Sequence, residues 1–314
     1  MTLSPTEYLD HLRDVASIAG VAVSEVVVPA EHHVILRRMR FRYLDWGTKG
    51  QPVVVFLHGG GLSAHTWDLP CLLLRERYHC LALDLRGHGD SEWSPEMDYG
   101  LEAHAGDVEA LVEQLGLDGF ALVGMSLGGL AAIAYAGRHA ARLRALTLID
   151  VGPEMRIEGS RRIADFIAAP AEFESVDEAV ERALSFNPHR DRRLLSRSLL
   201  HNLRRLPNGR LTWKHDRRHR GKIDLEDWAR RRRALWDEIP NITCPTLVVR
   251  GARSDVFHDE DATKLAGALP RAEWVRIEHA GHTVQGDNPR ALVAELQRFF
   301  GAHLAPGADA GRRG

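Results

Sequence analysis

The stretch Phe120-Ala121-Leu122-Val123-Gly124-Met125-Ser126-Leu127-Gly128 decides the fold of this chain. Its first four residues form a continuous apolar run, which predicts a strand covered on both faces. The small residues that follow, 129–137, predict a helix. A serine hydroxyl projects above a sheet only from a sharp strand-to-helix turn, where the residues two before and two after it must be nearly free of side chain. Gly124 and Gly128 meet that requirement, so Ser126 is a candidate nucleophile, although the same pattern also fits a purely structural turn.

Short apolar runs of the same kind recur along the chain and alternate with segments of helical periodicity. The runs are 53–57, 80–83, 146–149, 246–249 and 274–277. A helix is predicted over 101–115, where Gly116 ends it, and another over 289–300, which begins at a proline. This alternation predicts an α/β protein with an eight-stranded, mostly parallel, doubly wound sheet flanked by helices.

Three segments depart from the alternation. Residues 23–28 and 34–45 predict two antiparallel strands that lead into the sheet. Residues 154–240 contain no comparable strand-like run and are rich in arginine with periodic apolar residues, which predicts a helical cap inserted after the sixth strand. We expect the cap's basic charge to lie on solvated helix faces rather than on an anion-binding surface. The predicted division is an N-terminal extension (1–30), an α/β core (31–153 and 241–304), the cap (154–240) and a disordered tail (305–314).

Composition excludes several classes of protein. The 314 residues are 44% hydrophobic and 27% charged, with a formal net charge of −2, so no nucleic acid or acidic membrane is expected as a partner. The three cysteines lie far apart without metal-ligand spacing, which favours a reducing compartment. The first 20 residues lack the pattern of a signal peptide, and no window has the length of a membrane span. We therefore expect a cytoplasmic protein, and the sequence leaves its oligomeric state open.

A serine nucleophile needs a general base, and His282 has the required position. It follows the last predicted strand and precedes the last helix, in the segment Glu278-His279-Ala280-Gly281-His282. We prefer His282 to His279 because it lies deeper in the loop, after the glycine.

The imidazole in turn needs an acid to fix its tautomer, and Asp255 is the predicted residue. It lies just past the strand 246–249 and upstream of His282, which gives the chain order Ser, Asp, His. Asp150, at the end of the strand 146–149, is the strongest alternative. Asp259 and Asp261 are better explained as acids in the first turn of the next helix.

Acyl transfer also requires hydrogen-bond donors for a developing oxyanion. Consecutive glycines follow the strand 53–57 in His58-Gly59-Gly60-Gly61, and they predict an amide donor at Gly59 or Gly60, while His58 is expected to be structural. The second predicted donor is the amide of Leu127. Apolar side chains that could line a substrate pocket are Met125, Trp67 and Trp213, although a tryptophan more often belongs to a core.

With these residues in place, the chain resembles the α/β-hydrolase superfamily from Arg40 to Leu304, apart from the insertion. The turn Asp84-Leu85-Arg86-Gly87-His88-Gly89-Asp90-Ser91 is similar to a structural turn of that family, so no catalytic role is assigned to it. The resemblance is to the branch of esterases, lactonases, carbon–carbon hydrolases and cofactor-free haloperoxidases. A serine at position 126 argues against dehalogenases and epoxide hydrolases, which use an aspartate.

The function expected from these features is hydrolysis of a small to medium apolar carboxylic ester through an acyl-enzyme. The resemblance implies that no metal or organic cofactor is needed. Carbon–carbon bond hydrolysis, lactone hydrolysis and haloperoxidase chemistry on the same triad remain alternatives. A ligand-binding protein without catalysis, built on the same fold, is the alternative from a different class.

Overall fold

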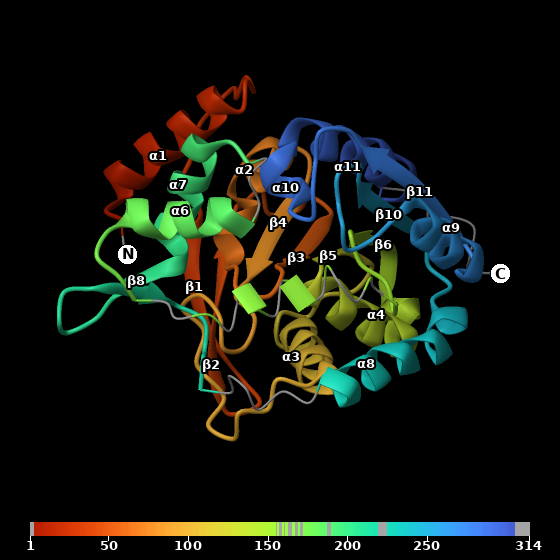
Figure 1. Cartoon of the computed structure of the whole chain (residues 1–314). Helices are drawn as coiled ribbons and strands as arrows, with labels where there is room; N and C mark the ends of the chain where they lie inside the picture. Colours follow the sequence, from red (N-terminus) through yellow and green to blue (C-terminus); the bar gives the residue numbers. More distant parts are fainter. Residues whose placement is uncertain are drawn as a thin grey trace.

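A computed structural model describes residues 3–304 of the chain, except 155, 157–158, 160, 163–164, 167–168, 170–171, 187–189 and 219–224. The predicted tail, 305–314, lies outside the described residues. Figure 1 shows a central sheet with helices on both of its faces. Among the described residues, no helix is both long and apolar enough to cross a lipid bilayer.

The central sheet has eight strands in the order β1-β2-β4-β3-β5-β6-β10-β11. Their bounds are β1 (Ala30–Leu36), β2 (Met39–Asp45), β3 (Val53–Leu57), β4 (His79–Leu83), β5 (Phe120–Met125), β6 (Leu143–Ile149), β10 (Thr246–Gly251) and β11 (Ala272–Ile277). Strand β2 pairs antiparallel with both β1 and β4, and the remaining neighbours pair in parallel. The predicted eight-stranded, mostly parallel sheet is confirmed.

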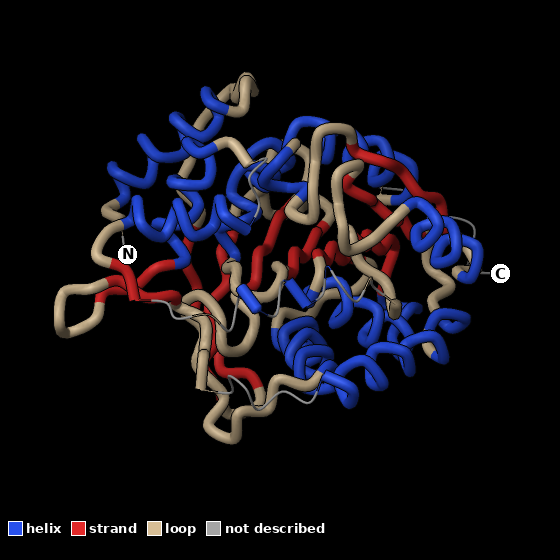
Figure 2. Tube along the Cα trace, viewed as in Figure 1, coloured by secondary structure: helices blue, strands red, loops and turns tan. Residues whose placement is uncertain are grey.

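Helices cover the two faces of this sheet, as Figure 2 shows. Successive residues of a strand point to opposite faces, and Val55 and Val54 accordingly belong to two different hydrophobic clusters. Helices α3 (Leu101–Gln114) and α4 (Leu127–His139) pack on the face of Val55. Helices α2 (Asp68–Leu74) and α11 (Pro289–His303) pack on the face of Val54. Both faces of these strands are buried, which explains why their sequences are continuous apolar runs.

The start of the chain differs from its prediction. Residues 23–28 are not a strand, and the predicted strand 34–45 is two strands, β1 and β2, joined by a tight turn. Arg37 and Arg38 both have positive φ (47° and 68°), the backbone that a two-residue hairpin turn requires. No glycine or asparagine marks this turn, so it could not be predicted from the residue types. Upstream, α1 (Pro5–Ile18) is a helix with a capping box between Ser4 and Glu7.

The insertion, residues 154–240, is not purely helical. It contains α6 (Val176–Phe186), α7 (Arg192–Asn202) and α8 (Leu225–Ala234), together with a small sheet in the order β7-β9-β8. The strands of that sheet are β7 (Glu172–Phe173), β8 (Leu203–Arg205) and β9 (Leu211–Trp213). A turn at Asn208-Gly209, where Gly209 has a φ of 85°, joins β8 to β9. This Asn-Gly pair is a hairpin signal that the prediction of a helical cap overlooked.

Two further helices border the loops at the carboxyl end of the sheet. Helix α9 (Asp259–Ala268) follows the loop after β10, and α10 (Val284–Asp287) follows the loop after β11. Short 3-10 turns complete the connections, at Ala64–Trp67, Ala140–Arg142, Leu235–Asp237 and Ile239–Asn241. Because parallel strands end at the same edge, the loops after β3, β5, β6, β10 and β11 meet there.

Candidate active site

Ser126 lies on the strained turn between β5 and α4. Its φ of 52° and ψ of −117° are outside the helical and extended regions, and α4 begins at the next residue. A Cβ atom added to Gly124 would lie 2.4 Å from the carbonyl oxygen of Gly128. A Cβ atom added to Gly128 would lie 2.4 Å from the carbonyl oxygen of Leu57. Both glycines are therefore required by close backbone contact, as the sequence pattern predicted.

His282 lies beside this serine. Its Nε2 atom is 3.1 Å from Ser126 Oγ, and its side chain is mostly buried. Its Nδ1 atom is 2.8 Å from Asp150 Oδ2. A carboxylate can only accept, so Nδ1 carries the proton and Nε2 is free to accept from the serine hydroxyl. This tautomer is the one that a general base for Ser126 needs.

The acid that contacts His282 is Asp150, and the prediction of Asp255 for this position is wrong. Asp255 is exposed and forms an ion pair with Arg162 in the insertion. Asp150 follows directly on the last residue of β6, is fully buried, and has a φ of 51°. That left-handed backbone turns the chain sharply at the sheet edge, where the carboxylate meets His282. Residues after β6 and after β10 lie side by side, because these two strands are parallel neighbours.

Two groups, one at the end of β10 and one in the loop that follows it, orient the Asp150 carboxylate. The amide of Gly251 donates to Oδ1 at 2.9 Å, and the hydroxyl of Ser254 donates to Oδ2 at 2.5 Å. Ser254 is buried, and its Oγ also accepts from the amide of Val256 at 3.2 Å. The loop after β10, where the sequence predicted the acid, therefore supports Asp150. It does so through Ser254 rather than through Asp255. Ser254 was not among the predicted site residues, because a lone serine in a loop carries no signal of its own.

Asp287 stabilises the loop that carries His282. The carboxylate of Asp287 accepts from the amide of Gly281 at 2.8 Å. Arg190 of the insertion lies 3.3 Å from the same carboxylate. Burial raises the pKa of Asp287, and the guanidinium of Arg190 opposes that rise. This ion pair connects the insertion to the histidine loop.

The glycine-rich loop after β3 lies against the serine turn. A Cβ atom added to Gly59 would lie 2.5 Å from Met125 Sδ and 3.3 Å from Ser126 Cβ, so a larger residue there would displace the Met125 side chain. His58 fixes this loop: its Nε2 accepts from the amide of Leu85 at 3.0 Å, and its Nδ1 therefore donates to the carbonyl oxygen of Gly59 at 2.8 Å. Burial lowers the pKa of His58 to about 3, so the ring is neutral. The predicted structural role of His58 agrees with these contacts.

Three backbone amides are available near Ser126. Leu127 is the first residue of α4, and the first N–H groups of a helix have no acceptor within the helix. Gly59 and Gly60 belong to the loop that packs on Ser126. These are the residues predicted as oxyanion donors, and the fold brings both segments to the serine.

The predicted pocket residues occupy different positions. Met125 is buried at the end of β5, with its sulfur against Gly59. Trp67 is fully buried and packs on Phe56 in the core, with ring centroids 5.2 Å apart. Trp213 lies in the core of the insertion, 5.1 Å from the ring of Phe173. Both tryptophans fill cores, as large aromatic side chains commonly do.

A cavity of about 480 Å³ lies away from this site, between α3 and α4. It is lined by polar and charged groups that include Arg37, Glu102 and His139. None of its lining residues belongs to the hydrogen-bonded chain of Ser126, so the cavity has no direct part in chemistry there.

The turn that begins at Asp84 is structural, as expected. Asp84 is fully buried, binds the guanidinium of Arg42 at 2.6 Å, and accepts from the amides of Ala64 and Asp90. Gly89 has a φ of 54°, and a Cβ atom there would lie 2.2 Å from the Asp84 carboxyl group. Through the amide of Ala64, these contacts fix the segment that follows the glycine-rich loop.

Comparison with known proteins agrees with this fold. The sequence model of the alpha/beta hydrolase fold family matches residues 52–289. The chain is 35% identical over 258 residues to esterase Rv0045c of Mycobacterium tuberculosis, a match that covers 80% of this chain and 83% of that protein. The crystal structure of the same esterase superimposes with a TM-score of 0.74 at 31% identity, covering 95% of this chain and 99% of that one. A 3-hydroxybutyrate-oligomer hydrolase of Cupriavidus necator is 27% identical, over 84% of this chain and 94% of that protein.

The fold and the site thus define a protein of the α/β-hydrolase class. This chain belongs to the alpha/beta hydrolase fold family.

Proposed function

We propose that the protein is a serine hydrolase that cleaves carboxylic esters, with Ser126 as nucleophile, His282 as general base and Asp150 as the orienting acid. The observation that carries this proposal is the continuous hydrogen-bonded chain from Ser126 Oγ through His282 to Asp150 Oδ2, at 3.1 and 2.8 Å. The similarity to an esterase over most of both chains supports the same reaction.

In the first step, Ser126 Oγ attacks the ester carbonyl carbon while its proton passes to His282 Nε2. The imidazolium that forms is stabilised by the buried Asp150 carboxylate, which already accepts from Nδ1. The tetrahedral oxyanion accepts hydrogen bonds from the amide of Leu127 and from that of Gly59 or Gly60. His282 then donates its proton to the leaving alcohol, and an acyl-enzyme remains on Ser126.

In the second step, water attacks the acyl-enzyme. His282 takes a proton from this water, and the same amides hold the second oxyanion. Collapse of that intermediate releases the carboxylic acid, and the proton returns from His282 to Ser126 Oγ. The cycle uses only side chains and amides of this chain.

The substrate we propose is a small to medium ester with an apolar acyl group, and we propose that the insertion caps the site. Three contacts support the cap: Arg190 with Asp287 at 3.3 Å, Asn202 with Ser63 at 2.7 Å, and Lys214 with Asp90 at 2.7 Å. They join the insertion to the loop that carries His282, to the segment after the glycine-rich loop, and to the turn that begins at Asp84. The three cysteines are buried and unpaired, which supports a cytoplasmic location within the same proposal.

Hydrolysis of p-nitrophenyl esters, from acetate to decanoate, tests the proposed reaction. The expected result is turnover that depends on acyl-chain length, because a capped site admits only part of the series. Ser126→Ala is expected to lose all but about a thousandth of the activity or less.

A control variant shows whether the loss of activity is specific to Ser126. The variant Ser185→Ala, at an exposed serine of α6, is the control and should retain wild-type rates. An inert wild type, or a Ser126→Ala protein that hydrolyses esters as fast as the wild type, would contradict the proposal.

A further inference from the structure

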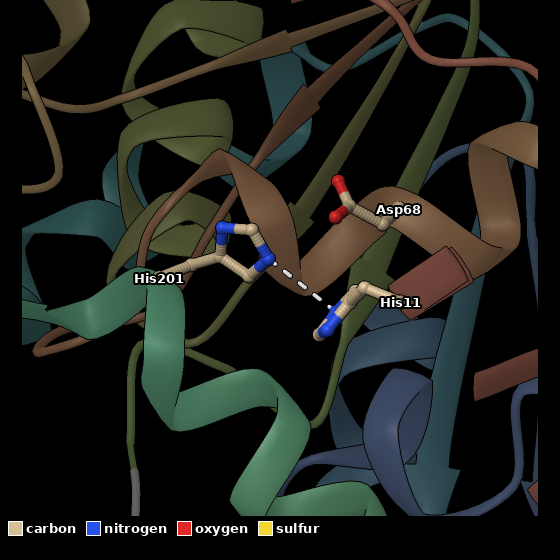
Figure 3. Close-up of side chains that lie close together, drawn as sticks. All are labelled: His11, Asp68 and His201. Carbon is tan, nitrogen blue, oxygen red and sulfur yellow. Dashed lines mark hydrogen bonds between the residues drawn. The ribbon is translucent and has the colours of Figure 1, made fainter. Parts of the chain in front are cut away.

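A second cluster of chemically reactive side chains lies outside the triad, where three helices meet. His11 comes from α1, Asp68 is the first residue of α2, and His201 lies near the end of α7. Figure 3 shows the two imidazole rings and the carboxylate facing one another. One ligand atom from each residue lies within 4.8 Å of the other two, and each of the three side chains is almost entirely buried. The Ser126–His282–Asp150 chain uses none of these residues.

The two imidazoles have the spacing of two ligands on one cation. His11 Nε2 and His201 Nε2 are 3.3 Å apart. Two nitrogens bound at roughly 2.0–2.1 Å to a tetrahedral Zn²⁺ lie about 3.4 Å apart. The rings are inclined edge to face, with an interplanar angle of 83°, and their two Nε2 atoms lie within hydrogen-bond distance of each other. Burial lowers the pKa of His11 and of His201, and the neutral imidazole is the form that binds metal.

The carboxylate has an oxygen without a partner. Asp68 Oδ2 accepts from the hydroxyl of Tyr8 at 2.8 Å and lies 3.1 Å from His65 Nδ1. Asp68 Oδ1 is buried and has no hydrogen-bond partner among the described residues. A buried carboxylate oxygen without a partner costs free energy, and a cation would remove that cost.

The surroundings resemble those that orient metal ligands. The Tyr8 hydroxyl fixes the carboxylate of Asp68, and the ring of His65 stacks on that of His201 at a centroid distance of 3.8 Å. Groups of this kind, which hold the ligands without touching the cation, raise metal affinity by limiting ligand motion.

We propose that His11, Asp68 and His201 form a site for a divalent transition-metal cation, with Zn²⁺ the best fit, and that this cation fastens α1 and α7 to the core. Two imidazoles and one carboxylate suit Zn²⁺ and its neighbours in the first transition series. Mg²⁺ and Ca²⁺ prefer oxygen ligands and are not expected to bind. The site could not be predicted from sequence spacing, because its three ligands are far apart in the chain.

The location gives the cation a structural role. His11 precedes the region that the family model matches, 52–289, so the site joins an element outside that region to the fold. Next to His201, the side chain of Asn202 accepts from the hydroxyl of Ser63, which follows the glycine-rich loop. The bound cation therefore holds the insertion against the loop that carries Gly59 and Gly60.

Calorimetric titration of the chelator-treated, full-length protein with Zn²⁺ tests the site. One equivalent is expected to bind at micromolar or lower Kd, and Co²⁺ is expected to give the visible absorption of a tetrahedral complex. The variants His201→Gln and Asp68→Asn are expected to bind at least about 100-fold more weakly, since each removes a ligand. His33→Gln, at an exposed histidine of β1, and Ser126→Ala are the controls and should bind like the wild type.

Trypsin cleavage after Arg13 gives a second readout that needs no enzyme activity. Arg13 is exposed in α1, and cleavage there requires α1 to detach or unfold. Zn²⁺ should slow this cleavage at least about 10-fold in the wild type and leave it unchanged in Asp68→Asn, whose folding circular dichroism verifies. Absence of saturable Zn²⁺ binding to the wild type would overturn the proposal. Equal Zn²⁺ affinity of the wild type and both ligand variants would also overturn it, because other histidines would then hold the metal.

Discussion

At the scale of single residues, the site depends on where each side chain meets its partner. Asp150 accepts three hydrogen bonds, from Gly251, Ser254 and His282, and these leave its carboxylate little freedom to rotate. Ser126 and Asp150 both have positive φ, so strained backbone presents the nucleophile and the acid to the same imidazole.

Exchange of Asp150 for asparagine is the sharpest test of the acid. In Asp150→Asn the side-chain amide donates where the carboxylate accepted, which favours the wrong tautomer of His282. We expect kcat for ester hydrolysis to fall on the order of 10³–10⁴-fold, with folding retained. Asp255→Asn should keep the wild-type kcat, because Asp255 is exposed and pairs only at the surface with Arg162. Steady-state kinetics of the two variants distinguish the acids, and the reverse order of effects would restore Asp255.

The sequence predicted Ser126, His282 and the glycine-rich loop because each pattern combines residue type with local geometry. Gly124 and Gly128 mark the crowded turn, and Gly281 precedes the histidine. The acid has no such pattern. Asp150 and Asp255 each follow a strand, and β6 and β10 are adjacent, so chain order alone could not choose between them. Only the contact between Asp150 and His282 does so.

At the scale of elements, continuous apolar runs predicted the core strands well, and β3 matches its prediction residue for residue. The hairpin β1–β2 was misplaced because Arg37 and Arg38 adopt positive φ without a turn signal. The strands of the insertion were missed because they are only two or three residues long. Short elements depend on their neighbours for stability, and a sequence pattern of that length does not distinguish them.

The turn between β5 and α4 yields a prediction about stability. Gly128→Ala would bring a methyl group against the backbone oxygens of Leu57 and His58, so β3 or α4 must shift. We expect the free energy of unfolding to fall by about 2–4 kcal/mol, with loss of ester hydrolysis.

Gly267→Ala is the matched control for that variant. Gly267 is an exposed residue of α9 with no atom within 4 Å of the added methyl group. Alanine there should raise the free energy of unfolding by about 0.5–1 kcal/mol. Urea unfolding of both variants measures the two effects, and equal effects of the two substitutions would contradict the crowding at the turn.

At the scale of the whole molecule, several buried histidines make the stability of the fold depend on pH. Burial is the largest cause of the lowered pKa in each of five of them, namely His11, His58, His65, His104 and His201. These rings lie at the α1–α7 contact, in the glycine-rich loop and in α3. Their distribution makes much of the interior sensitive to acid.

The stability of the protein should therefore fall below about pH 6.5. In that range the unfolded chain binds protons on these histidines and the folded chain does not, so each one lowers the free energy of unfolding by up to about 1.4 kcal/mol per pH unit. Asp68 opposes them: burial raises its pKa to about 7, so the folded chain takes up that proton first as pH falls. We expect the free energy of unfolding, measured by urea unfolding followed by circular dichroism, to be lower at about pH 5.5 than at about pH 8.

His104→Leu isolates one of these histidines. His104 is fully buried, and neither ring nitrogen has a hydrogen-bond partner among the described residues. Leucine should therefore raise the free energy of unfolding more at pH 5.5 than at pH 8, by about 1 kcal/mol. Urea unfolding at the two pH values measures this difference. Parallel stability curves for variant and wild type would contradict it, and His33→Gln, at an exposed position, serves as the control.

The central claim is that Ser126 is an activated nucleophile, and covalent labelling tests it most directly. A fluorophosphonate should add to the wild-type protein once, and peptide mass spectrometry should locate the adduct on Ser126. Labelling should disappear in Ser126→Ala and slow greatly in His282→Ala, because the hydroxyl then has no base. Absence of labelling, or an adduct on any other residue, would contradict the account and favour a ligand-binding protein on this fold.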